Sequence, residues 1–207
     1  MISALQGFKG NFNEFDALIV SSESNHPYTR SIKWIFSLPK LPKIFFNRWD
    51  FYDAVIALAE NSRPFYEFGV WNGISFQYLI NNFKKGFGFD TFTGLPEDWG
   101  DHQKEGTYDV EGKLPEVPSN VELIVGLFQD TLEDFLKEHS QPVAYLHMDA
   151  DLYSSTKYVL DTLKDRIVTG TVISFDEIFG KQIFLDHEMK AWVDFVNENE
   201  IEYEWVI

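Results

Sequence analysis

Short apolar runs alternate with segments of helical periodicity along most of the 207-residue chain. The apolar runs predict six strands, at residues 65–68, 86–90, 121–125, 143–148, 171–175 and 202–207. The amphipathic segments predict helices at residues 49–60, 75–83, 131–138, 155–164 and 184–199. Strands and helices that alternate in this way predict an α/β fold with a doubly wound, mostly parallel sheet.

The N-terminal part of the chain has a weaker pattern. Residues 1–47 carry apolar side chains, but Pro39 and Pro42 interrupt any long helix or strand there. We interpret residues 1–61 as a cap or partner-binding arm that ends in a helix. Residues 62–207 are expected to form the ligand-binding domain, within one structural unit overall.

A long polar segment, residues 94–120, follows the second predicted strand and contains four glycines and three prolines. Loops of this length are usually functional or disordered. Because it leaves the carboxyl end of a strand, where open α/β sheets bind ligands, we expect a substrate lid, with plain disorder as the alternative. His102 and Tyr108 are its candidate acceptor contacts.

Charge and composition narrow the class of partner. The formal net charge of -16 would repel phosphate backbones and anionic membrane surfaces, so neither is an expected partner. No apolar run approaches the roughly 20 residues of a membrane-spanning helix. The chain has no cysteine and no secretory leader pattern, which predicts a soluble, cytoplasmic protein acting on a small molecule.

A glycine-rich turn separates the first predicted strand from the next helix. It reads EFGVWNG from Glu67 to Gly73, and the acid of GFD, Asp90, follows about twenty residues after the turn. Glycines let the backbone approach a ligand, and an acid at this distance binds a ribose diol. The third glycine of a dinucleotide fingerprint is absent, and Glu67 favours a cationic or amino-bearing ligand. S-adenosylmethionine fits these requirements.

Acidic side chains close two later strands, in HMDADLYSST (residues 147–156) and SFDE (residues 174–177). Adjacent parallel strands would bring Asp149, Asp176 and Glu177 around one crevice, where mutual repulsion demands a cation or a raised pKa. Oxygen ligands without cysteine favour Mg²⁺ or another hard divalent cation. The alternative is that such side chains cap helices, as Asp151 or Ser155 would for the predicted helix 155–164.

The order EFGVWNG, GFDTFTGLP, GLFQDTL, HMDADLYSST and ISFDE resembles the macrocin O-methyltransferase family over about residues 65–192. The resemblance implies a class I methyltransferase fold, S-adenosylmethionine as methyl donor and a divalent metal that binds the acceptor hydroxyls. The family usually ends its fifth strand with two aspartates, whereas this chain has Asp176-Glu177. The longer glutamate would alter metal geometry or affinity.

The resemblance also implies roles by position in these motifs. Asp149, Asp176 and Glu177 would be metal ligands, and Asp149 would also be the catalytic base, with Asp151 in reserve. The expected cofactor contacts are Glu67, Gly69, Val70, Trp71, Gly73, Ser75, Asp90, Thr91, Phe92, Phe128, Gln129 and Asp149. Trp71 and Phe92 would flank the cofactor, although aromatic side chains in such places are as often part of a core.

Methyl transfer requires an aligned donor and acceptor and a hydroxyl made more nucleophilic. We therefore expect a metal-assisted, S-adenosylmethionine-dependent O-methyltransferase that acts on a hydroxyl of a sugar or another vicinal diol. The alternatives are an inactive S-adenosylmethionine-binding module and a dinucleotide-dependent reductase on the same fold. The pattern lacks the last antiparallel strand of class I methyltransferases, and the sheet edge that this leaves predicts a homodimer.

Overall fold

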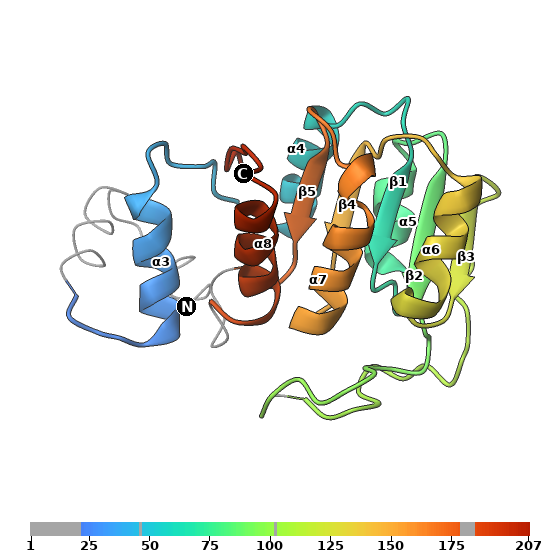
Figure 1. The fold of residues 1–207 in the computed structure, drawn as a ribbon, viewed down its shortest axis with the longest axis horizontal. Coiled ribbons are helices and arrows are strands. Elements are labelled where there is room, and N and C mark those ends of the chain that lie inside the picture. Colours follow the sequence, from blue (N-terminus) through green and yellow to red (C-terminus); the bar gives the residue numbers. More distant parts are fainter. Residues whose placement is uncertain (1–21, 46, 102, 179–184) are drawn as a thin grey trace.

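The computed structural model describes residues 22–45, 47–101, 103–178 and 185–207. It contains a five-stranded, all-parallel sheet in the order β3-β2-β1-β4-β5 (Figure 1). The strands are β1 (Phe65–Phe68), β2 (Gly86–Asp90), β3 (Val121–Val125), β4 (Tyr145–Met148) and β5 (Val172–Phe175). The four residues of β1 and of β4 are all buried, as expected for the centre of a parallel sheet covered on both faces.

Helices cover both faces of the sheet. The helices are α3 (Pro27–Ser37), α4 (Arg48–Leu58), α5 (Ile74–Ile80), α6 (Phe128–Glu138), α7 (Tyr153–Thr162) and α8 (His187–Glu198), of which α3 lies apart from the sheet, beyond α8 (Figure 1). In Figure 1, α6 and α7 lie in front of the sheet, and α4 and α5 lie behind it. The chain is therefore a three-layer α/β structure, as the alternation of strands and helices predicts.

Aromatic side chains from β1 divide between the two layers of core. Phe65 packs with Tyr52 of α4 and Phe76 of α5 on one face. Tyr66 and Phe68 pack with helices α6 and α7 on the other face. Side chains alternate between faces along a strand, so this central strand joins both core layers. Helix α4, which the sequence places in the N-terminal arm, shares its core with the sheet.

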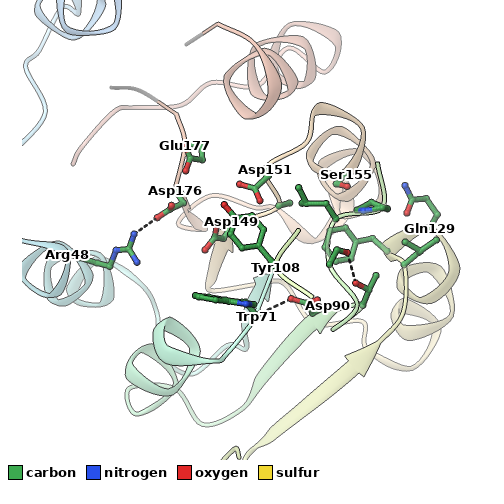
Figure 2. Close-up of a pocket in the computed structure, with 18 residues that line it drawn as sticks. Arg48, Trp71, Asp90, Tyr108, Gln129, Asp149, Asp151, Ser155, Asp176 and Glu177 are labelled. Atoms are coloured by element: carbon green, nitrogen blue, oxygen red, sulfur yellow. Dashed lines mark hydrogen bonds and ion pairs between the residues drawn. The ribbon is translucent and has the colours of Figure 1, made fainter. Parts of the chain in front are cut away.

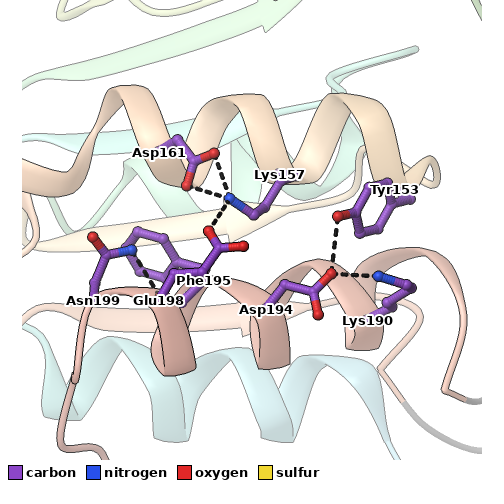
Figure 3. Close-up of polar contacts among 8 residues, drawn as sticks. All are labelled: Tyr153, Lys157, Asp161, Lys190, Asp194, Phe195, Glu198 and Asn199. Carbon is purple, nitrogen blue, oxygen red and sulfur yellow. Dashed lines mark hydrogen bonds and ion pairs between the residues drawn. The ribbon is translucent and has the colours of Figure 1, made fainter.

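Helix α8 packs along α7, and a set of polar contacts joins the two helices (Figure 3). Lys157 of α7 lies between Asp161 and Glu198, with Nζ–O distances of 2.5 and 2.8 Å. The Tyr153 hydroxyl donates to Asp194 of α8 at 2.9 Å. Leu160 contributes to the apolar part of this interface with Trp192 and Phe195. These contacts fix the position of α8 relative to the sheet.

Five of the six predicted strands are confirmed, and the sixth, at residues 202–207, is wrong. This segment has no regular secondary structure and pairs with no strand among the described residues. Its aromatic residues pack instead on α8 and α3: the Trp205 ring lies 5.2 Å from Trp34, and Tyr203 lies 5.1 Å from Trp192. The alternation of aromatic and polar residues that predicts a strand here reflects one-sided packing.

The five predicted helices are present, with ends displaced by up to three residues. Helix α6 begins at Phe128, three residues before the expected start. The first residue predicted for α8, residue 184, lies outside the described part of the chain. Helix α3 was not predicted, and residues 1–21 of the expected N-terminal arm, which spans residues 1–61, are also outside the described residues. Within the described ranges, every helix is too short or too polar to span a bilayer.

Candidate active site

A cavity lies at the carboxyl edge of the sheet, where ligands bind in open α/β folds (Figure 2). Every strand contributes through the loop that follows it, and α4, α7 and the 91–120 segment complete the walls. The lining residues are Arg48, Gly69, Trp71, Asp90, Thr91, Gly94, Leu95, Pro96, Tyr108, Leu127, Phe128, Gln129, Asp149, Ala150, Asp151, Ser155, Asp176 and Glu177.

The glycine turn after β1 makes close backbone contact with the end of β4. Gly69 has a φ of 92°, and a Cβ atom there would lie 1.9 Å from the backbone oxygen of Asp149. No side chain fits this space, and the positive φ alone disfavours any other residue. The requirement for glycine is thus steric as well as conformational, and it sets the distance between the turn and the acidic residues after β4.

The Asp90 carboxylate organises the turn. One of its oxygens accepts the N–H groups of Val70 and Trp71 at 2.8 and 2.7 Å, and the other accepts the N–H of Phe92 at 2.7 Å. A carboxylate has about four acceptor positions, so one position is left for a ligand hydroxyl. Asp90 lines the cavity where a ribose diol is expected, and it also holds the surrounding loops together.

Glu67 lies behind the glycine turn rather than on the cavity wall. Its side chain is fully buried, and one oxygen accepts from the Ser75 hydroxyl at 2.6 Å. The other oxygen, Oε2, has no hydrogen-bond partner among the described residues. Burial raises the pKa of Glu67 well above its usual range, and the bond from Ser75 partly opposes this. Glu67 thus lies in the layer behind the cavity wall, and its contact with the cofactor stays a prediction.

Aromatic residues near the turn separate into a wall and a core. Trp71 is 47% exposed and lines the cavity, and its ring contacts Tyr108 from the 91–120 segment at 5.9 Å. Phe92 is 1% exposed and belongs to the core under α4 and α5. Trp71 and Tyr108 are therefore placed to contact a ligand, and the structure supports the core alternative for Phe92.

Four carboxyl groups gather at one end of the cavity: Asp149 and Asp151 after β4, and Asp176 and Glu177 after β5 (Figure 2). We call these four residues the acidic cluster. Burial raises the pKa of Asp149 well above its usual range, and repulsion from Asp176, Asp151 and Glu177 raises it further. A carboxylate with a raised pKa is a stronger proton acceptor, which is what a general base requires.

Arg48, at the start of α4, is a cavity residue that the sequence analysis missed. Its guanidinium lies 3.2 Å from an Asp176 oxygen. Its positive charge lowers the pKa of Asp149 and so opposes part of the repulsion within the acidic cluster. The only local signal beside Arg48 is Asn47, whose side chain caps the start of α4. Nothing in the sequence near Arg48 connects it with Asp176, which lies 128 positions later in the chain.

Asp151 has a φ of 58°, an uncommon conformation for a residue other than glycine that aspartate tolerates better than most. The helix cap considered for Asp151 and Ser155 is wrong. Helix α7 begins after Leu152, no side-chain hydrogen bond caps its start, and Ser155 lies inside the helix. Both residues line the cavity. Positive φ at a cavity residue is typical of functional sites.

His147 belongs to a buried hydrogen-bonded network behind the cavity. Its Nδ1 lies 2.8 Å from the Ser174 hydroxyl, and its Nε2 lies 3.3 Å from the Tyr52 hydroxyl. Burial lowers the pKa of His147 to about 4, so the ring is neutral at physiological pH. The network fastens α4, and with it Arg48, to the ends of β4 and β5.

The described part of the 91–120 segment is an irregular loop held by its own hydrogen bonds. Leu95 exchanges backbone bonds with Thr107 and Gly106 at 2.9 Å each, and isolated bridges join Thr93 to Asp109 and Trp99 to Gln103. Leu95, Pro96 and Tyr108 line the cavity, as expected for a lid. His102, the other candidate acceptor contact, lies outside the described residues.

The structure brings most of the predicted site residues to one cavity. Those on its wall are Gly69, Trp71, Asp90, Thr91, Phe128, Gln129, Asp149, Asp151, Asp176 and Glu177. Five others lie behind the wall: Glu67, Val70, Gly73, Ser75 and Phe92. Gly73 is covered by Pro115, whose Cβ would lie 2.9 Å from a Cβ at that glycine.

The metal ligands predicted from sequence have the right chemistry for a hard cation, since all are carboxylates on one cavity. Their arrangement in this structure, however, is not that of a metal site. Among the described residues, no group of three or more histidine, cysteine or acidic side chains is spaced to hold a metal ion. Asp176 is instead paired with Arg48. Metal binding therefore requires at least that this ion pair opens.

Two solved structures share the fold. CalS11, a calicheamicin methyltransferase, is 21% identical with a TM-score of 0.55, and the match covers 94% of this chain and 87% of that chain. An apo structure of CalS11, described as a TDP-rhamnose 3'-O-methyltransferase of calicheamicin biosynthesis, is 22% identical with a TM-score of 0.54 and covers 97% and 93%. The predicted class I methyltransferase fold is confirmed.

A family model described as a methyltransferase domain matches residues 66–178, more than half of the chain. The chain belongs to this family. The predicted methyltransferase is confirmed at this level, while the macrocin type within it stays a prediction. None of the curated protein sequences matches the chain.

Proposed function

We propose that the protein transfers a methyl group from S-adenosylmethionine to a hydroxyl of a small molecule. The observation that carries the proposal is one cavity with two chemically different ends. The glycine turn, Asp90 and Gln129 line one end of the cavity, which we call the donor groove, and the acidic cluster lies at the other end. The surrounding negative charge attracts a sulfonium and repels an anionic dinucleotide. Family membership also gives no support to the reductase alternative.

S-adenosylmethionine supplies a methyl group on a positively charged sulfur. The protein's part is to orient the acceptor hydroxyl, remove its proton and exclude water. Asp149 is the proposed base because burial and neighbouring carboxylates raise its proton affinity. Asp151, across the same turn, is the reserve base. Trp71 and Tyr108 close the wall between the donor groove and solvent.

We further propose that the acceptor is a sugar or another vicinal diol and that Mg²⁺ or a similar ion assists. The motif order resembles macrocin O-methyltransferases, and the fold resembles that of a TDP-rhamnose 3'-O-methyltransferase. Asp149, Asp176 and Glu177 would hold the ion once Arg48 releases Asp176. When bound, a divalent cation lowers the pKa of a hydroxyl that it contacts.

Calorimetric titration with S-adenosylhomocysteine tests the donor site. We expect binding to the wild-type protein and at least about fivefold weaker binding to Gln129→Ala, since Gln129 lines the groove. Glu133→Ala, one turn further along α6 and exposed, is the matched control and should bind as wild type. Asp90 is a poor choice because its loss also releases three backbone N–H groups. No binding to the folded wild-type protein would refute the proposal.

The same titration with Mg²⁺ tests the metal. Arg48→Gln removes the competing cation at Asp176, so we expect this variant to bind Mg²⁺ more tightly than wild type. Asp149→Asn should bind it more weakly than wild type. Equal heats in all three proteins would contradict the proposed metal site and would leave the proposed methyl transfer standing. Donor binding without turnover of any diol would favour the inactive-module alternative.

A further inference from the structure

Glu188, in the first turn of α8, is a buried carboxyl group to which neither the sequence motifs nor the proposed chemistry assigns a role. Its side chain is 1% exposed. Burial raises its pKa well above the usual range, and repulsion from Asp149 adds to this effect. A residue so costly to bury requires specific partners. Those partners are backbone groups beside the acidic cluster.

The backbone hydrogen bonds that join β4 to β1 and β5 to β4 both end just before the acidic cluster. The last regular bonds are donated by Asp149 N to Phe68 O at 2.9 Å and by Asp176 N to Met148 O at 3.0 Å. The next residues, Ala150 and Glu177, are 7% exposed. Their buried N–H groups need other acceptors, because an unsatisfied one costs about 1–3 kcal/mol.

Glu188 supplies both acceptors. Its Oε1 accepts the N–H of Ala150 at 3.3 Å, and its Oε2 accepts the N–H of Glu177 at 2.9 Å. One carboxylate therefore joins the turn after β4 to the turn after β5. The first of these turns contains Asp151 at positive φ, so it needs support from the structure around it.

The support is rigid because α8 is itself fixed. Lys157 and Tyr153 of α7 hold Glu198 and Asp194 on the side of α8 that faces α7 (Figure 3). Met189, next to Glu188, is 4% exposed in the apolar interface between the two helices. The start of α8 thus has a fixed position relative to the sheet, and its side chains transmit that position to both turns.

We propose that Glu188 is a positioning residue of the active site, whose carboxylate holds the two acidic turns at the separation that methyl transfer requires. It touches neither the cavity nor the reacting atoms. Its effect comes from the backbone at Ala150 and Glu177, which directs Asp149 and Asp151 on one side and Asp176 on the other. The part of this inference that concerns catalysis rests on the proposed function.

Hydrogen exchange and kinetics of Glu188→Gln test the inference. The amide is nearly isosteric, but its NH₂ group cannot accept, so one backbone N–H loses its partner. We expect amide exchange in residues 149–152 and 176–178 to accelerate at least about tenfold, with β2 and α5 unchanged. We expect kcat to fall at least about tenfold, with the KM for the methyl donor within about threefold of wild type.

Glu198→Gln is the matched control, because it removes an α7–α8 ion pair on the same helix and leaves both turns untouched. It should alter thermal stability without the exchange or kcat changes. Glu188→Gln with wild-type exchange in both turns would overturn the inference, as would wild-type kcat. If the wild-type protein transfers no methyl group, the proposed function fails, and exchange alone decides whether Glu188 holds the turns.

Discussion

At the residue scale, the buried polar groups of strands β1 and β4 differ in whether they have hydrogen-bond partners. Glu67 and His147 are buried with hydrogen-bond partners near the cavity. Tyr66, between Phe65 and Glu67 on β1, is fully buried, and its hydroxyl has no partner among the described residues. It faces α6 and α7, away from the α4–α5 layer. Its hydroxyl therefore costs stability without serving the site.

Replacing Tyr66 by phenylalanine should stabilise the protein by about 1 kcal/mol at neutral pH, since an unpaired buried hydroxyl is removed. Burial raises the pKa of Tyr66 to about 12, from 10.0. Between these values the unfolded state releases the proton and the folded state keeps it, so stability falls as pH rises, by up to about 3 kcal/mol. Tyr66→Phe should lack this loss in urea unfolding at pH 10–12.

Tyr145→Phe is the control for that comparison. The Tyr145 hydroxyl contacts the Ser174 hydroxyl at 2.6 Å, so its removal should destabilise the protein by about 1 kcal/mol. If both variants changed stability in the same direction, the difference between a paired and an unpaired hydroxyl would not explain the result.

At the scale of elements, the turn from β1 to α5 has the strictest requirement. Gly69→Ala should destabilise the protein by more than about 2 kcal/mol, because the new Cβ meets the Asp149 backbone and the φ is positive. Gly112→Ala is the matched control, with a φ of 70° and open space around it. It should cost about 1 kcal/mol in the same unfolding measurement. Equal losses would show that conformation alone matters.

Sequence predicted the elements well where local signals are strong. β1, β2 and β3 match residue by residue, because each is a short, mostly apolar run bounded by glycine or polar residues within an alternating pattern of strands and helices. Residues 202–207 alternate aromatic and polar side chains as a strand would, but their aromatic rings pack on Trp192 and Trp34. Whether such a segment pairs or merely packs is decided by its tertiary neighbours, which the local pattern does not contain.

The site was predictable in part for the same reason. Residues that follow strands, such as Asp90 and Asp149, reach the carboxyl edge by topology alone. Arg48 and Glu188 come from helices that pack beside the sheet, and their positions depend on the packing of α4 and α8. No spacing in the sequence indicates that packing. The sequence also does not distinguish residues of the cavity wall from those of the layer behind it. Trp71 and Phe92 were both expected to flank the cofactor, yet Trp71 lines the cavity and Phe92 lies in the core.

At the scale of the whole molecule, β5 is one of the two edge strands of the sheet, and no strand pairs with its outer side among the described residues. An edge of this kind is a template for association. We propose a homodimer that covers it, and light scattering at micromolar concentration should give twice the chain mass. A wild-type protein with the mass of one chain would contradict the proposal.

The contact of Gly69 with the backbone of Asp149 couples the donor end of the cavity to its acidic end. The two ends of the cavity meet there without an intervening side chain or space. A ligand that shifts the turn must also shift the acids, and the converse holds. Donor and acceptor affinities should therefore be thermodynamically linked, with each ligand changing the affinity for the other by the same factor.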